Sequence, residues 1–152
     1  RLAEALAATS NAVGAPTHEG GTYLCMEGPQ FSTRAESQLY RSWGVSVIGM
    51  TNLPEARLAR EAELPYATLA MVTDYDCWHE THEAVTVEAV VAVMQENVAK
   101  AKEIIVELAR YVPAPTGRPA TSALAGAIIT NPDSISSDVR DKLRPLIGKY
   151  LP

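Results

Sequence analysis

The segment TDYDCW places two carboxylates, Asp74 and Asp76, on either side of a tyrosine and directly after an apolar run. In extended backbone, side chains two residues apart point to the same face. Two nearby carboxylates resist ionising together, so the pKa of one of them rises. The pair therefore indicates a ligand site, a metal site or an ordinary exposed surface.

A metal site is the first alternative, in the segment CWHETHE. Cys77, His79 and His82 lie close together there, with Glu80 and Glu83 nearby. Their spacings match no closed zinc set, the chain offers no second Cys/His pair, and the order H-E-T-H is not the H-E-x-x-H of zinc peptidases. Solvated loop histidines explain the segment better, and we predict no metal.

The strand ends form another candidate site, because ligands of α/β sheets collect at the carboxyl ends of the strands. Phe31 and Met50 also fit an ordinary core, and Thr51 fits a helix cap. An aromatic ring, a thioether, a hydroxyl and carboxylates together suit a flat heterocycle joined to a polar group. The residues alone leave that ligand unnamed. The strand-end residues are Glu27, Gly28, Pro29, Gln30, Phe31, Met50, Thr51, Asp74, Tyr75 and Asp76.

The elements that position these residues alternate between strands and helices, which predicts an α/β fold with buried strands. Thr33 and Glu36 have the spacing of a capping box, and Pro54 opens a helix. Residues 113–119 read as a linker to the C-terminal helices. The pattern predicts strands at 20–29, 45–50 and 66–73, and helices at 1–14, 34–43, 53–64, 86–112, 120–130 and 136–151.

Composition excludes several functions. Thirteen basic against eighteen acidic residues give a net charge of -5, without a basic cluster for nucleic acid. The apolar stretches fall short of a membrane span, so we expect neither a nucleic-acid nor a membrane partner. Cys25 and Cys77 are better read as reduced thiols, because 47% hydrophobic residues supply a core without a disulfide. This indicates a cytoplasmic protein.

Three linked motifs resemble a known family. MEGPQFSTRAES, GVSVIGMTNLPEARLAREAELPYATLAMVTDYDCW and HEAVTVEAVV are similar to the carboxyl-terminal half of the 5′-methylthioadenosine phosphorylases, in the purine nucleoside phosphorylase superfamily. The resemblance implies that residues 1–152 are the carboxyl-terminal portion of a single phosphorylase domain, with a mixed central β-sheet flanked by helices. It further implies phosphorolysis of 5′-methylthioadenosine to adenine and 5-methylthioribose 1-phosphate, which serves purine and methionine salvage.

The resemblance answers the question that the two carboxylates raise. Asp74 matches the family's acid, which donates a hydrogen bond or a proton near N7 as adenine leaves. Asp76 would raise the pKa of Asp74, so the pair would titrate jointly. Asp76 would also read the amino edge of adenine. Ser32, where relatives that prefer 6-oxopurines carry glutamate, favours 6-aminopurines.

The remaining substrate residues are implied by the same resemblance. The positions of Phe31 and Met50 lie against the substrate and its ribose, and Thr51 helps to hold phosphate. Tyr75 belongs to the same strand-end segment and is counted with the substrate-binding residues. An apolar pocket that suits a methylthio group would be lined by Val87 and Val90, which can belong to the core stripe of their helix at the same time.

The family holds phosphate largely with an amino-terminal half, and none of its motifs occurs in these residues. The resemblance therefore implies that this portion is supplied by another chain or a missing segment, and that the complete protomer forms a homotrimer or a hexamer. Phosphate is a co-substrate, and no metal or organic cofactor is implied. Two alternatives stay open: a phosphorylase of adenosine or 5′-methylthioinosine, and a non-catalytic nucleoside-binding domain.

Overall fold

The computed structural model describes residues 2–79, 86–111 and 119–151. The chain divides into two compact units, each of which is described by itself. The first unit carries all the predicted site residues. It comprises Arg1–Leu53 and Ala67–Pro113, and the second unit comprises Pro54–Tyr66 and Ala114–Pro152.

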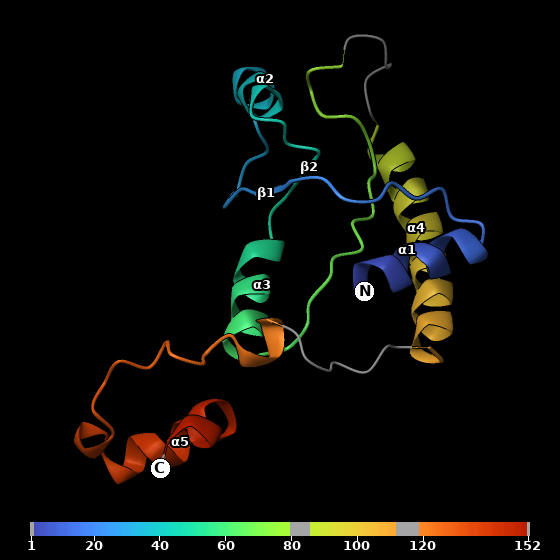
Figure 1. Cartoon of the computed structure of the whole chain (residues 1–152). Helices are drawn as coiled ribbons and strands as arrows, with labels where there is room; N and C mark the ends of the chain where they lie inside the picture. Colours follow the sequence, from blue (N-terminus) through green and yellow to red (C-terminus); the bar gives the residue numbers. More distant parts are fainter. Residues whose placement is uncertain (1, 80–85, 112–118, 152) are drawn as a thin grey trace. The chain divides into compact units, whose positions relative to one another are not determined.

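A two-stranded parallel sheet connects the predicted strand ends of the first unit (Figure 1). Tyr23 pairs with Val47 and Cys25 with Gly49, so both strands end at the same edge. The sheet continues by one hydrogen bond, in which the Met26 N–H donates to the Gly49 carbonyl at 2.9 Å. The elements of the first unit are α1 (Leu2–Ala12), β1 (Tyr23–Cys25), α2 (Arg34–Ser42), β2 (Val47–Gly49) and α4 (Val87–Ala109).

The prediction of a strand at 66–73 is wrong for the described structure. A strand requires a partner for its backbone N–H and C=O groups, and among the described residues β1 and β2 pair only with each other. Side chains hold the segment instead. Thr68 Oγ1 donates to Asn52 Oδ1 at 2.9 Å, and Asn97 Nδ2 on α4 donates to the Val72 carbonyl at 3.0 Å.

Helix α2 begins as its capping box predicts. The Glu36 N–H donates to Thr33 Oγ1 at 3.3 Å, and the Thr33 N–H donates to Glu36 Oε2 at 2.7 Å. These bonds satisfy two of the backbone donors that a helix start leaves free. The helix start is therefore fixed one residue after Ser32.

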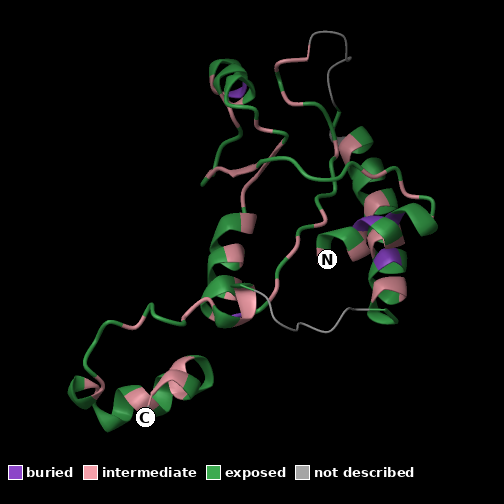
Figure 2. Ribbon diagram, in the orientation of Figure 1, coloured by how far each residue is buried: buried purple, intermediate pink, exposed green. Residues whose placement is uncertain are grey.

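The core of the first unit lies where α1 packs against α4, and the buried residues gather there in Figure 2. Ala7 and Ile104 are buried, and Ser10 is buried with its hydroxyl donating to the Leu6 carbonyl at 2.8 Å. The predicted stripe of α4 contains Ile105, which is 60% exposed. Because α1 covers the face of α4 that carries Ile104, the prediction holds only in part: of the predicted stripe, Met94, Val98 and Ile105 are exposed, whereas Val90, Ala101 and Leu108 are half-buried.

The second unit contains most of α3 (Asn52–Glu61) and the C-terminal elements. The predicted helix at 120–130 is wrong: a short 3-10 helix and turns replace it, and Gly126 has a φ of +77° that a right-handed helix does not allow. The linker at 113–119 lies outside the described residues except for Pro119. The C-terminal elements are η1 (Pro119–Ser122), η2 (Pro132–Ser134), α5 (Ser137–Ile147) and η3 (Gly148–Tyr150).

None of the helices in the described part of the chain has both the length and the apolar character that a bilayer span requires.

A buried carboxylate links α3 to the C-terminal end of the second unit. Glu63 is 8% exposed and adopts a φ of 55° just after α3. It accepts hydrogen bonds from the Leu124 N–H at 2.9 Å and the Tyr150 hydroxyl at 2.5 Å, and it pairs with Lys149. Burial opposes its ionisation, but the hydrogen bonds from Lys149, Tyr150 and Leu124 outweigh burial and lower the pKa of Glu63 to about 2.

We expect Glu63→Gln to lower the unfolding temperature of the second unit by several degrees near neutral pH, because a neutral amide cannot pair with Lys149. The folded-state pKa lies below the ordinary value of 4.5, so this stabilisation is present above pH 4.5 and disappears as the pH falls toward about 2. Thermal unfolding across that range checks the prediction, with the exposed Glu61→Gln as the control. A difference in unfolding temperature between wild type and variant that does not change with pH would contradict the prediction.

Candidate functional site

The two predicted site residues Ser32 and Asp76 lie together. Ser32 Oγ donates to both carboxylate oxygens of Asp76, at 3.1 and 3.3 Å, and the Cys77 N–H donates to Asp76 Oδ1 at 2.8 Å. Cys77 Sγ in turn contacts the Ser32 carbonyl at 3.6 Å. The loop before α2 and the segment around Asp76 are therefore joined at two points.

These contacts keep Asp76 ionised. Burial opposes its ionisation, yet Ser37, the Cys77 N–H and Ser32 outweigh burial and lower the pKa of Asp76. The Ser37 hydroxyl is fully buried on α2, and its geometry falls outside that of a standard hydrogen bond, so it acts on the carboxylate as a nearby dipole. Burial and then the charge of Asp76 raise the pKa of the Cys77 thiol, which stays protonated.

Asp74 has a different environment from Asp76. It is exposed, and its carboxylate accepts a hydrogen bond from Thr73 Oγ1 at 2.7 Å, whereas Asp76 is half-buried and bonded to other groups. The two carboxylates thus differ in their surroundings: Asp74 is exposed, whereas Asp76 is held by hydrogen bonds.

The segment that carries both carboxylates also contains three aromatic rings that contact one another. The rings of Tyr75 and His79 stack with centroids 4.7 Å apart, and Trp78 lies edge-on to Tyr75 at 6.0 Å. The Arg41 guanidinium of α2 lies over the Trp78 ring, 3.5 Å from its centroid. Tyr75 itself is 60% exposed.

The other predicted residues are arranged around the sheet edge. Phe31 is 82% exposed and Thr51 is exposed, so the described structure does not bury either of them in a core. Met50 is half-buried beside Gly28, where a Cβ would lie only 2.1 Å from the Met50 Cε. Gly28, with a φ of +72°, therefore makes room for the thioether at the position predicted for the ribose.

The apolar pair predicted for the 5′ group begins α4. Thr86 caps this helix, with its Oγ1 accepting from the Ala89 N–H at 3.2 Å. Val90 is half-buried. Val87 is the first residue of α4, and its side chain lies outside the described part of the chain.

The histidine-rich segment CWHETHE holds the residues of the metal-site alternative. Among the residues that the structure describes, no three His, Cys, Asp or Glu side chains are grouped to hold an ion. Glu80, His82 and Glu83 lie outside those residues.

Comparison with known proteins identifies the family. The model of the family described as the phosphorylase superfamily matches residues 1–110. The chain belongs to the phosphorylase superfamily. The resemblance seen in the sequence motifs is thereby confirmed, and so is the α/β class predicted for a nucleoside phosphorylase.

Members of the superfamily with assigned names support a more specific relationship. The chain is 53% identical over 150 residues to an S-methyl-5′-thioadenosine phosphorylase of Geobacter sulfurreducens, which covers 99% of the chain and 52% of that relative. It is 55% identical to the enzyme of the same name from Thermosynechococcus vestitus, with coverage of 99% and 52%. The chain therefore spans about half the length of the curated relatives that it matches.

Solved structures agree with this relationship. A methylthioadenosine phosphorylase from an antarctic soil metagenomic library has a TM-score of 0.85 and 38% identity, and the match covers 95% of this chain and 52% of the other. The Schistosoma mansoni methylthioadenosine phosphorylase in complex with adenine has a TM-score of 0.67 and 30% identity, with coverage of 83% and 50%.

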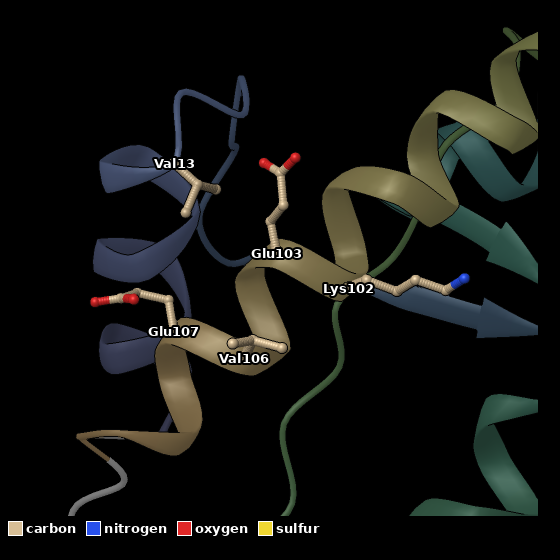
Figure 3. Close-up of a pocket in the computed structure, with 5 residues that line it drawn as sticks. All are labelled: Val13, Lys102, Glu103, Val106 and Glu107. Carbon is tan, nitrogen blue, oxygen red and sulfur yellow. The ribbon is translucent and has the colours of Figure 1, made fainter.

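A hollow of about 570 Å³ in this chain lies away from the predicted site. Figure 3 shows Val13 just after α1, and Lys102 on α4 with its side chain pointing away from Val13. Lys100 Nζ donates to the Val13 carbonyl at 3.1 Å nearby. The hollow is lined by Val13, Lys102, Glu103, Val106 and Glu107, none of which the sequence predicts as a site residue.

Two residues beside the candidate site, Ser37 and Arg41, were not among the residues predicted from the sequence. Ser37 and Arg41 are four residues apart on α2, so they lie on the same face of the helix. That face carries both the buried hydroxyl near Asp76 and the guanidinium over Trp78. The four-residue spacing indicates that Ser37 and Arg41 share a face of the helix, but the sequence does not show which segment that face contacts.

Proposed function

We propose that this chain is the carboxyl-terminal portion of a 5′-methylthioadenosine phosphorylase, in which inorganic phosphate displaces adenine from the ribose carbon C1′. The names of the relatives and the adenine complex of the Schistosoma mansoni enzyme support the substrate class. Phosphate is a co-substrate, and the reaction requires no metal or organic cofactor.

The arrangement of Asp76 carries this proposal. Its carboxylate is held ionised by the Ser32 hydroxyl and the Cys77 N–H, at 3.1 Å and 2.8 Å. An ionised carboxylate accepts hydrogen bonds only, so it suits the exocyclic amino group of adenine and rejects the carbonyl oxygen of a 6-oxopurine. The glutamate that relatives with 6-oxopurine preference carry is replaced here by Ser32, which helps to hold this carboxylate.

Asp74 is the leaving-group acid of the proposed reaction. Expulsion of an adenine anion is unfavourable, so a carboxylic acid near N7 assists by donating a proton or a hydrogen bond. Asp74 is exposed and can approach N7 of a bound base, while Asp76 is held by Ser32 and the Cys77 N–H and reads the amino edge. Phosphate stabilises the positive charge that develops on the ribose as the glycosidic bond breaks.

The remaining residues bind the other parts of the nucleoside. Phe31 and Tyr75 provide aromatic surface for the base, and Met50 lies at the ribose. Val87 and Val90 line the pocket for the methylthio group. Their apolar side chains accommodate this group and disfavour a charged 5′ substituent, which would lose its hydration there. Thr51 contacts phosphate from a position two residues after the end of β2, where its side chain is exposed.

The proposed enzyme includes an amino-terminal portion that completes the phosphate site. Two observations support it: the chain spans about half of its relatives, and α4 carries exposed apolar residues such as Met94 at 50% and Ile105 at 60%. Exposed apolar side chains on a helix are typical of a surface that another segment covers. We further propose a homotrimer or hexamer in the cytoplasm, where the free thiols of Cys25 and Cys77 stay reduced.

Phosphate-dependent release of adenine tests the proposal. The complete protein, containing this chain, is incubated with 5′-methylthioadenosine with and without phosphate, and adenine and 5-methylthioribose 1-phosphate are measured by chromatography. We expect both products only when phosphate is present. Binding of the nucleoside without turnover would favour the non-catalytic alternative instead.

Adenosine is a second candidate substrate. One structural relative is named adenosine/methylthioadenosine phosphorylase, with a TM-score of 0.63 and 26% identity. The same assay with adenosine and with 5′-methylthioinosine separates these readings. Equal kcat/KM for adenosine and 5′-methylthioadenosine would argue against the apolar pocket at Val90.

Base preference provides a sharper prediction. We expect Asp76→Asn combined with Ser32→Glu to reduce the preference for adenine over hypoxanthine nucleosides about tenfold or more, because an amide can turn either a donor or an acceptor toward the base. The ratio of kcat/KM for 5′-methylthioadenosine and 5′-methylthioinosine measures this. Ser136→Glu, at the exposed cap of α5, is the matched control. An unchanged ratio would place base selection elsewhere.

A further inference from the structure

Helix α2 contacts the segment that carries Asp76 at a second point, made by Arg41. The Arg41 guanidinium carbon lies 3.5 Å from the centroid of the Trp78 ring, well within the range of cation–π attraction. Trp78 is half-buried, whereas Arg41 is exposed. The cation therefore covers a partly buried ring that lies two residues beyond Asp76.

Trp78 does not move independently of its neighbours. Its ring lies 6.0 Å from that of Tyr75 and 5.0 Å from that of His79, and Tyr75 and His79 stack at 4.7 Å. Each such aromatic pair adds to the stability of the segment. The chain from Tyr75 to His79 thus folds on itself, so a contact that fixes Trp78 also restrains Asp76.

The two contacts lie at opposite ends of α2. Ser32 immediately precedes the helix cap, and Arg41 lies in the last turn. Arg34, where the helix begins, and Arg41 are separated by roughly 10 Å along the helix at 1.5 Å per residue. The contacts at Ser32 restrain the segment at one end of α2 only, whereas a further contact near the other end fixes its orientation along the helix.

We propose that Arg41 is a positioning residue that orients Asp76 toward the adenine base through its contact with the Trp78 ring. The inference rests on the proposed function for its consequence in catalysis, but the contact itself can be tested without any activity. Arg41 does not touch the substrate. Its effect is on the orientation of a carboxylate that Ser32 already holds at the other end of the helix.

The first experiment measures the order of the segment in this chain. Cys77, next to Asp76, is exposed, and its rate of alkylation by iodoacetamide is followed by peptide mass mapping. We expect Arg41→Met to raise that rate several-fold and Arg41→Lys, which keeps a cation over the ring, to leave it near wild type. Gln38→Met, on an exposed position of the same helix, is the control. Equal rates in wild type and Arg41→Met would overturn the proposal.

A spectroscopic measurement accompanies alkylation. The chain contains two tryptophans, so Trp43→Phe leaves Trp78 as the single emitter. In that background, Arg41→Met is expected to shift the emission to longer wavelength because the indole loses its cover, and Arg41→Lys is expected to shift it less. An unchanged spectrum would show that Arg41 does not cover the ring and would overturn the proposal.

The second experiment uses the complete protein. We expect Arg41→Met to raise KM for 5′-methylthioadenosine about three- to tenfold with kcat little changed, because Asp76 contacts the base in both ground and transition states. Arg41→Lys should recover most of the loss. If wild type lacks turnover, the proposed function fails, and alkylation still decides the role of Arg41. If wild type is active and Arg41→Met keeps its KM, the positioning role fails.

Discussion

Replacing Asp74 by asparagine is expected to reduce the turnover of 5′-methylthioadenosine about 10²-fold or more, with a much smaller change in KM. An amide can still contact N7 but cannot donate a proton as the glycosidic bond breaks. Asp74 is exposed, so the substitution leaves the packing of the fold intact and the loss reports on catalysis. Measurement of kcat and KM on the complete protein checks the prediction.

Controls for Asp74 separate acid catalysis from surface charge. Asp141→Asn removes a carboxylate from an exposed position of α5 and should leave kcat unchanged. A nucleoside whose leaving group departs without protonation should react nearly as fast with the Asp74 variant as with wild type. Near-normal turnover of 5′-methylthioadenosine by Asp74→Asn would remove Asp74 from the mechanism.

The second large effect concerns phosphate. These 152 residues by themselves are expected to release no adenine from 5′-methylthioadenosine at any phosphate concentration. A phosphate dianion is held by arginine side chains and clustered backbone N–H groups, and the exposed hydroxyl of Thr51 cannot replace them. Adding the amino-terminal portion, as a second polypeptide or in one longer chain, should produce the activity.

Mass spectrometry of an active preparation checks this requirement. It should find either a second fragment of comparable size or a longer intact chain. The assay on the purified 152 residues is the matched control, with circular dichroism to establish that the helices are present. A single species of these residues, folded and fully active with phosphate, would contradict the prediction.

Local signals in the sequence predicted the helices well. The start of α2 follows from Thr33 and Glu36, whose capping box is a contact between neighbours in the chain. The strand expected at 66–73 depends instead on hydrogen-bond partners from strands distant in sequence. The apolar content of a segment does not show whether such partners are present. The helix expected at 120–130 fails at Gly126, where backbone freedom allowed a turn that the apolar pattern did not indicate.

The site was predicted in part. Motif resemblance selected Ser32 and Asp76, and the structure brings them into hydrogen-bond contact. It did not select Ser37 or Arg41, because their importance arises from tertiary contacts of one face of α2. A stripe on α4 was expected from periodicity, yet periodicity alone does not determine which of two adjacent isoleucines, Ile104 or Ile105, faces the core.

The position of Asp76 next to the cap of α2 has an electrostatic consequence. The peptide dipoles of a helix sum to partial positive charge at its amino end, and Ser32, which binds Asp76, lies one residue before that end. The hydrogen bonds described for this carboxylate come from a hydroxyl and a backbone N–H, both of them uncharged. Among the residues that the structure describes, no lysine or arginine pairs with Asp76, so the backbone field favours the anion alongside uncharged donors, and the negative charge remains available to attract an amino group on a base.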